Sequence, residues 1–127
     1  MEKSIIILAF ALSSIVLNAL ADGYNDSNKK EIGHFFAFLS IFSFVLMPIC
    51  YHIDTFEIVK YLVGYTFIRF GIFDLVYNIT RDLDYYYIGN TSFVDKFLKL
   101  LKLHDSNFIF LRILTFITGI ALIFKIV

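Results

Sequence analysis

The sequence has no tryptophan, one proline and a single cysteine among its 127 residues. Because Cys50 is alone, an internal disulfide and any CxxC metal or redox motif are excluded. Positive and negative side chains balance to a formal net charge of zero, so the composition indicates neither a nucleic-acid partner nor an acidic tail. The signatures GxGxxG, HExxH and GxSxG are also absent, which removes the common dinucleotide, zinc-protease and serine-hydrolase motifs.

What the sequence does contain is apolar side chains: 59% of its residues are hydrophobic and 19% are aromatic. One soluble domain cannot bury so much apolar surface. We therefore predict an all-α, multi-pass protein of the cell membrane, with residues 1–127 forming one membrane domain and the lipid bilayer as its partner. Without tryptophan, tyrosine is expected to form the aromatic belt at the membrane surface, at Tyr51, Tyr61 and Tyr85 to Tyr87.

Four apolar segments are long enough to cross a bilayer, which needs about 17 to 25 helical residues. They cover residues 4–21, 35–51, 58–80 and 108–127. Asn28 and Glu31 have the spacing of a capping box ahead of the second segment, and the same spacing recurs ahead of the third at Asp54 and Glu57. Pro48 removes one backbone hydrogen bond late in the second segment, so a kink is expected there.

The one long connection, over residues 81–107, contains a further predicted helix at residues 93–104. On a helical wheel its apolar side chains lie opposite its basic side chains. The apolar face comprises Val94, Phe97, Leu98 and Leu101, and the basic face carries Lys96, Lys99 and Lys102. This pattern is typical of an amphipathic helix at the membrane interface, with its lysines at the membrane surface and anionic lipid headgroups as candidate partners. The alternative is a helix that packs on the bundle and exposes its basic face to water.

The distribution of positive charge predicts the orientation, because lysine and arginine concentrate on the cytoplasmic side of a membrane. The first and third connections carry Lys29, Lys30, Arg81, Lys96, Lys99 and Lys102, whereas the opposite side has Lys3, Lys60 and Lys125. The connection over residues 81–107 is therefore expected to be cytoplasmic, with both termini outside. An alternative for segment 1–21 is a cleaved signal peptide, because Ala19, Leu20 and Ala21 have the small-x-small form of a cleavage site.

Polar side chains gather at the end of the predicted bundle where the second segment begins. They form a stripe with a period of four late in the first segment and another stripe late in the third. A further polar residue, His34, lies near the start of the second segment, and Arg112 lies one turn inside the fourth. The candidate binding cluster comprises Asn18, Asp22, Asp26, His34, Arg69, Asp74, Asn78, Arg81 and Arg112.

Arg69 and Asp74 stand within the apolar third segment, where each charge costs about 2.5 to 3.5 kcal/mol at the centre of a membrane helix. The two side chains are separated by about 140° around the helix and about 7.5 Å along it, so they are poor partners for each other. We expect Arg69 to meet a polar group of the first or second segment, or water. For Asp74 the candidate partners are Asn18, His34, Arg81 and Arg112.

Four functions fit this cluster. In the first, the polar residues are structural or bind a ligand or partner protein. In the second, Asp22, His34 and Asp74 line a path for protons or cations. The third is a membrane-embedded metal-dependent enzyme, in which Asp22, Asp26, His34 and Asp74 hold a divalent cation and an arginine holds a lipid phosphate. The fourth is a holin-like phage membrane protein. A divalent cation is the one candidate cofactor, catalytic residues are not assigned, and the sequence leaves open a homo-oligomer.

Several stretches carry a family resemblance. They are ALADGYND at the end of the first segment, the start of the second segment at His34, RFGIFDLVYN followed by Arg81, and YIGNTSFVDK in the long connection. With these stretches the chain resembles small multi-pass membrane proteins of bacterial and phage genomes that carry no assigned function, over most of its length. The resemblance implies no substrate, and it implies that seven polar residues belong together: Asp22, Asp26, His34, Arg69, Asp74, Asn78 and Arg81.

Overall fold

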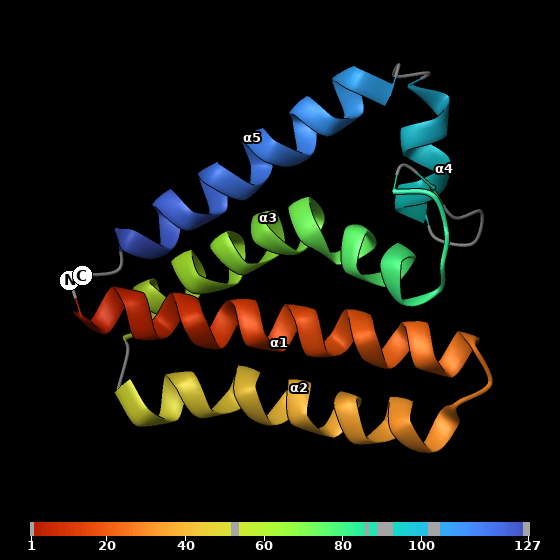
Figure 1. Cartoon of the computed structure of the whole chain (residues 1–127). Coiled ribbons are helices and arrows are strands. Elements are labelled where there is room, and N and C mark those ends of the chain that lie inside the picture. The colour runs from red at the N-terminus through yellow and green to blue at the C-terminus, as the bar shows by residue number, and fades with distance from the viewer. Residues whose placement is uncertain (1, 52–53, 86, 89–92, 102–104, 126–127) are drawn as a thin grey trace.

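The computed structural model describes residues 2–51, 54–85, 87–88, 93–101 and 105–125, and within these ranges it contains helices and no strand. The helices are α1 (Glu2–Asp26), α2 (Lys30–Tyr51), α3 (Thr55–Thr80), α4 (Phe93–Leu100) and α5 (Asp105–Phe124), as Figure 1 shows. The predicted all-α fold is confirmed. Three helices are long and apolar enough to cross a membrane: α1 over Lys3–Asp26, α3 over Thr55–Thr80 and α5 over Ser106–Phe124.

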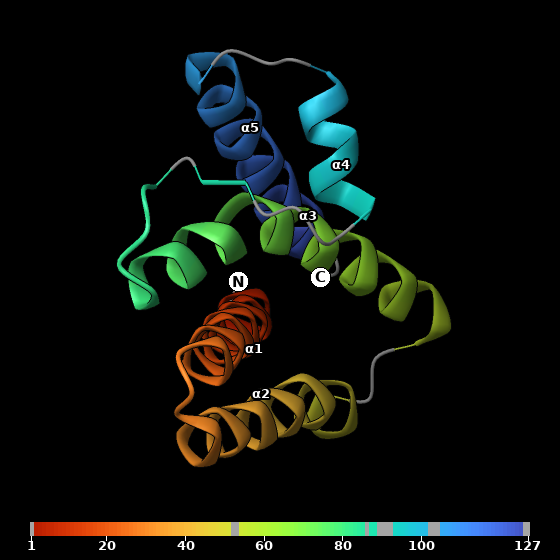
Figure 2. The same ribbon diagram turned by 90° about the vertical axis from the view of Figure 1, so that its right-hand side faces the viewer.

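The four long helices pack in the order α2, α1, α3 and α5 (Figures 1 and 2). α1 and α2 run antiparallel, and α3 lies between α1 and α5. The start of α1 and the end of α5 lie at one end of the bundle, whereas the end of α1, the start of α2 and the end of α3 lie at the other (Figure 1). This arrangement brings the polar stripes of the first and third predicted segments to the same end.

The core lies where α1 meets α3 and α5. Its buried side chains are Ile7, Ala11, Ile15, Tyr61, Ile68 and Ile123. Tyr61 corrects the expected aromatic belt, because its side chain is only 1% exposed and packs against the rings of Phe44 and Tyr65. Tyr61 and Ile68 are two helical turns apart and therefore share the face of α3 that is turned inward. Two other tyrosines of the expected belt, Tyr85 and Tyr87, are exposed.

Glycines allow α3 and α5 to approach closely. A Cβ atom on Gly119 of α5 would lie 2.6 Å from Ile68 Cγ1, 2.7 Å from the Gly64 carbonyl oxygen and 2.8 Å from the Ile68 backbone nitrogen. A Cβ atom on Gly71 would lie 2.8 Å from Phe116 Cβ. Two of these neighbours are backbone atoms, which cannot rotate away. Small residues at such crossings are typical of membrane helices, where packing rather than the hydrophobic effect drives association.

Two buried serines join α1 to α2. The Ser40 hydroxyl donates a hydrogen bond to the Ser14 carbonyl oxygen at 2.8 Å, and the Ser14 hydroxyl donates to the Ser40 carbonyl oxygen at 3.0 Å. The Tyr65 hydroxyl of α3 lies 3.3 Å from the Ser14 hydroxyl. Polar bonds between membrane helices contribute about 0.6 kcal/mol on average, so this reciprocal pair fixes the register of α1 and α2 more than it adds stability.

The polar end of α1 is longer than predicted and closes in a Schellman motif. Asn28 has a φ of 61° and its amide N–H donates to the Asn25 carbonyl oxygen. The amide N–H of Lys29 donates to the Tyr24 carbonyl oxygen. These two bonds satisfy the last carbonyl groups of α1. The expected role of Asn28 as the N-cap of the second helix is therefore wrong, because an N-cap residue needs an extended backbone.

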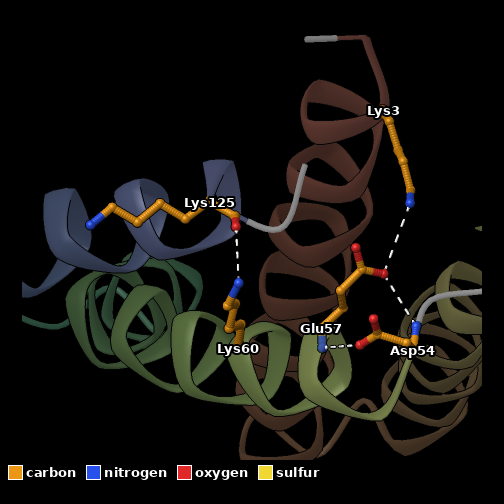
Figure 3. Close-up of polar contacts among 5 residues, drawn as sticks. All are labelled: Lys3, Asp54, Glu57, Lys60 and Lys125. Carbon is orange, nitrogen blue, oxygen red and sulfur yellow. Dashed lines mark hydrogen bonds and ion pairs between the residues drawn. The ribbon is translucent and has the colours of Figure 1, made fainter.

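At the opposite end of the bundle, exposed polar contacts join the start of α3 to α1 and to Lys125, which follows α5 (Figure 3). The predicted capping box is confirmed there: the Asp54 carboxylate accepts from the Glu57 amide, and the Glu57 carboxylate accepts from the Asp54 amide. Lys3 of α1 reaches the same Glu57 carboxylate at 4.0 Å. The Lys60 ammonium donates to the backbone carbonyl oxygen of Lys125 at 3.2 Å. Lys3 near the start of α1 and Lys125 after the end of α5 therefore both contact α3.

α4 covers the first part of the predicted amphipathic helix. Leu98 is buried, whereas Lys96, Lys99 and Leu100 are exposed. Leu98 is therefore packed inward and the two lysines face outward, but Phe97 and Leu101 of the predicted apolar face are 50% and 47% exposed. Other predictions fall outside the described residues: those on Tyr86 and Lys102, and on the side chains of Pro48, Cys50, Tyr51 and Val94.

Candidate functional site

Arg69 finds its polar partner on α1. Its Nη1 group donates a hydrogen bond to Asn18 Oδ1, and its guanidinium carbon lies 3.9 Å from the centre of the Phe73 ring. The half-buried Asp22 carboxylate, one turn further along α1, attracts the same guanidinium electrostatically. The expectation that Arg69 meets a polar group of the first helix is confirmed. These three contacts replace water around a charge that lies within an apolar helix.

Asp74 pairs with Arg112 across the contact between α3 and α5. The Arg112 Nη2 group lies 2.8 Å from Asp74 Oδ2, and the guanidinium carbon lies 4.3 Å from the centre of the Phe108 ring. The Arg112 side chain is 9% exposed and the Asp74 side chain 36%. Arg112 is one of the four expected partners of Asp74, so this prediction is confirmed. The pair has no net charge, which lowers the cost of placing both groups inside the bundle.

A third polar junction lies where α1 and α3 end. The Tyr77 hydroxyl donates to Asp26 Oδ2 and accepts a hydrogen bond of 2.8 Å from Arg81 Nη1. Arg81 also lies 3.7 Å from the same Asp26 oxygen. The hydrogen bond to Tyr77 is the main cause of the raised pKa of Arg81. Sequence analysis missed Tyr77, although its position four residues before Arg81 places both on one face of the helix.

Asn78 and His34 complete the predicted cluster but have different surroundings. Asn78 is 1% exposed, and its Nδ2 group donates to the backbone carbonyl oxygens of Tyr87 at 3.0 Å and Tyr85 at 3.4 Å. It therefore holds the chain that follows α3 against that helix. His34 is exposed near the start of α2 and belongs to none of the three junctions. Eight of the nine predicted residues thus take part in separate contacts, and His34 takes part in none of them.

The proposed metal site is not formed. Among the residues that the structure describes, no three His, Cys, Asp or Glu side chains come close enough together to hold a metal ion. Asp26 and Asp74 lie beside Arg81 and Arg112 instead. The hypothesis that Asp22, Asp26, His34 and Asp74 share a divalent cation is therefore wrong. A regular spacing on each helix places residues on a face, but it does not decide which faces meet.

A pocket of about 300 Å³ lies beside the pair of Asp74 and Arg112. It is formed by α3, α5 and Tyr85 of the connection after α3, and its walls are mostly apolar. The lining residues are Gly71, Ile72, Leu75, Tyr85, Ile109, Arg112, Ile113 and Phe116. Sequence analysis found Arg112 but missed the pocket, because its walls come from apolar residues that look like ordinary lipid-facing positions.

Arg112, which lines this pocket, has one buried group without a partner. Its Nε atom is buried and has no hydrogen-bond acceptor among the described residues. A buried donor without an acceptor costs about 1 to 3 kcal/mol, so such a group calls for a function or a bound molecule. Gly71 leaves the wall beside Phe116 without a side chain.

No protein-family model, curated protein or solved structure matches this chain.

Proposed function

We propose that this chain is an integral membrane protein that binds an apolar, membrane-dissolved chain or ring in the pocket between α3 and α5. The observation that carries the proposal is the Arg112 guanidinium, nine-tenths buried at the wall of an otherwise apolar pocket. Binding sites for small molecules combine mostly apolar walls with a few polar groups that fix the orientation of the ligand. The combination of Arg112 with Ile72, Ile113 and Phe116 has this composition.

The position and size of the pocket suit a ligand that arrives from the bilayer. The rim residues Leu75, Ile109 and Ile113 are 38%, 39% and 52% exposed, so the pocket opens on the outer surface of α3 and α5. Its volume of about 300 Å³ lies at the lower end of the range for small-molecule sites, about 300 to 1,000 Å³. There is room for one ring or part of one hydrocarbon chain.

We further propose that α2 is a fourth span and that α4 lies at the membrane interface. α2 has 22 residues and is therefore about 33 Å long, enough for a hydrocarbon core of about 30 Å. Its exposed side chains include Phe35, Phe38, Ile41 and Phe42, which suits a lipid-facing surface. The lysines Lys96 and Lys99 of α4 are exposed and support contact with anionic headgroups on the cytoplasmic side.

The contacts of the polar residues support binding over an ion path. Arg69 is bonded to Asn18, and Asp74 is paired with Arg112. Charges engaged in this way between helices stabilise a closed bundle rather than line a wet route. The ion path and the holin-like function remain hypotheses, and no contact of the described residues favours either.

Photolabelling tests the proposed pocket. An alkyl diazirine, a hydrocarbon chain that carries a photoreactive group and no carbonyl, is added to the purified protein in dodecyl maltoside, and labelled peptides are mapped by mass spectrometry. We expect saturable labelling of α3 and α5 at the pocket. Replacement of Ile113 by Trp fills the pocket with a larger side chain, so labelling there should fall by about tenfold.

Ile117→Trp is the matched control. Ile117 lies one turn further along α5, is 57% exposed and does not line the pocket. This variant should therefore be labelled within about twofold of the wild-type chain. Equal labelling of wild-type protein and Ile113→Trp, or labelling spread evenly over the exposed faces of all helices, would overturn the proposal.

A further inference from the structure

Tyr85 is the residue of the pocket wall that belongs to neither α3 nor α5, because it lies in the connection that follows α3. Gly71 and Phe116 line the pocket where the two helices touch: a Cβ atom on Gly71 would lie 2.8 Å from Phe116 Cβ. Ile109 lines it about 10 Å nearer the start of α5. Since α3 ends and α5 begins at the same end of the bundle (Figure 1), Ile109 and Tyr85 mark the end of the pocket nearest the membrane surface, which we call the surface end.

The turn that ends α3 sets the direction of the chain before Tyr85. Asp82 has a φ of 54°, in the left-handed region. The amide N–H of Leu83 donates to the Asn78 carbonyl oxygen at 2.9 Å, and that of Asp82 donates to the Ile79 carbonyl oxygen at 3.2 Å. These two bonds form a Schellman motif. The chain therefore leaves α3 along a defined path, and Tyr85 follows Leu83 by two residues.

The buried amide of Asn78 holds the connection beside α3. Asn78 is 1% exposed, and its Nδ2 group donates to the Tyr87 carbonyl oxygen at 3.0 Å and to the Tyr85 carbonyl oxygen at 3.4 Å. The amide N–H of Tyr87 donates in turn to the Asp84 carbonyl oxygen at 2.9 Å. Buried amide donors need an acceptor. Asn78 therefore joins the path of the connection to the packing of α3, and Tyr85 is fixed at the pocket from both sides.

A tyrosine suits the surface end of an apolar pocket. Tyr85 lines the pocket and yet is 60% exposed, so the residue borders the pocket on one side and the surroundings of the bundle on the other. A tyrosine combines an apolar ring with a hydroxyl group that can stay hydrated, and it is therefore common where apolar and wet regions meet. The exposed rim at Leu75 and Ile113 leaves entry from the bilayer open, so a ligand does not have to pass Tyr85.

From these observations we infer that Tyr85 closes the surface end of the pocket and contacts the bound hydrocarbon, and that Asn78 is the positioning residue that holds Tyr85 there. This inference rests on the function proposed above and adds a residue that binds the ligand. It gives Tyr85 a second role beside that of an interfacial tyrosine, and it gives the buried amide of Asn78 an effect on binding.

The absence of tryptophan from the sequence provides a direct test of the contact. Tyr85→Trp introduces a single indole at the pocket. Tyr87→Trp is the matched control, because Tyr87 is 41% exposed in the same connection and does not line the pocket. Bromodecane, whose bromine quenches an indole that it touches, is added to each variant in dodecyl maltoside. We expect a saturable loss of emission from Tyr85→Trp that decane reverses, and a small loss from Tyr87→Trp that decane does not reverse. Identical curves for the two variants would overturn the inference.

Labelling by the alkyl diazirine measures how much the closure adds to binding. Tyr85→Ala removes the ring, so the half-saturating concentration of the diazirine should rise by about three- to tenfold, the effect of losing one apolar contact. Tyr85→Phe keeps the ring and should bind within about twofold of the wild-type chain. Because Tyr85 is exposed, neither change should unfold the protein. An unchanged half-saturating concentration in Tyr85→Ala would contradict the closure.

A double-mutant cycle tests the role of Asn78. Asn78→Ala removes both hydrogen bonds to the connection and should weaken labelling about as much as Tyr85→Ala does. If Asn78 acts through Tyr85, the double variant should bind no more weakly than Tyr85→Ala alone. Losses that add in the double variant would refute the positioning role. Circular dichroism establishes folding, and Asn78→Ser, whose shorter side chain cannot reach both carbonyl oxygens, replaces Asn78→Ala if that variant is unfolded.

Failure of this inference differs from failure of the proposed function. If the diazirine does not label the pocket of the wild-type chain saturably, the proposed function itself is wrong. If wild-type labelling is saturable and Tyr85→Ala binds equally well, the pocket stands and Tyr85 is an interfacial tyrosine only.

Discussion

Arg69 and Asp74 are close together in α3, yet they bond to different helices. Arg69 reaches Asn18 on α1, and Asp74 reaches Arg112 on α5. Each charged residue in a membrane helix costs about 2.5 to 3.5 kcal/mol unless it is paired or hydrated. At the scale of single residues, the charges of α3 are therefore explained by two separate contacts that bind α3 to its neighbours.

Asp74→Leu should leave the buried Arg112 guanidinium without its carboxylate partner. We expect a loss of about 1 to 3 kcal/mol in the free energy of unfolding, because a buried charged donor loses its acceptor. Asp74→Asn retains an acceptor oxygen at nearly the same position and should lose less than half as much. The measurement is equilibrium unfolding in mixed micelles of dodecyl maltoside and SDS. Equal stability of the Leu variant and the wild-type chain would show that the ion pair does not support the fold.

At the scale of helices, α1 combines two kinds of contact. One face presents Ile7, Ala11 and Ile15 to the core, and Ser14 bonds to α2. The contact between α3 and α5 depends on small residues, because Gly64 and Gly119 allow the two backbones to meet. The glycine contact aligns α3 and α5 so that Asp74 faces Arg112 and the neighbouring apolar side chains enclose the pocket.

Gly119→Ala should weaken the contact between α3 and α5. The new methyl group would lie 2.7 Å from the Gly64 carbonyl oxygen and 2.8 Å from the Ile68 nitrogen, so the helices must move apart. Overpacking of this kind costs about 1 to 3 kcal/mol, measured by the same unfolding experiment. Ala121→Leu is the control: Ala121 is exposed on the same helix, and its larger side chain should change the stability by less than about 0.5 kcal/mol. A Gly119→Ala variant as stable as this control would contradict the close contact.

At the scale of the whole molecule, the two ends of the bundle carry different polar contacts. The polar end carries the junctions of Asp26 and Arg81 and the connection that precedes α4. The other end carries the contacts of Lys3 with Glu57 and of Lys60 with the carbonyl oxygen of Lys125. The distribution of lysine and arginine predicts which of these two ends faces the cytoplasm.

Single-cysteine labelling tests the orientation. In a Cys50→Ser background, Asp84→Cys marks the connection after α3, and Thr55→Cys marks the opposite end of the bundle; both positions are exposed. A membrane-impermeant maleimide applied to intact cells should label Thr55→Cys and leave Asp84→Cys unlabelled until the membrane is opened. The reverse pattern would invert the proposed orientation. Labelling of both positions on one side would rule out α3 as a span.

The sequence by itself determined the all-helical class of this protein and three of its long apolar helices. A bilayer requires long apolar helices, so composition and the lengths of apolar runs predict an all-α membrane protein, and α1, α3 and α5 are apolar enough to be spans. The need of a buried charge for a partner likewise predicted that Asp74 would reach another helix. Local chemistry also fixed the start of α3, because the capping box of Asp54 and Glu57 involves only neighbouring residues.

Only the tertiary structure decided which faces meet. Helical periodicity placed Asp22, Asp26 and His34 at one end of the bundle, but whether they form a metal site depends on the rotation of each helix, which is set by packing at distant positions such as Gly64 and Gly119. The inward position of Tyr61 has the same origin. The pocket beside Arg112 was also beyond sequence analysis, because a cavity is the space left between side chains of two helices and has no pattern within either one.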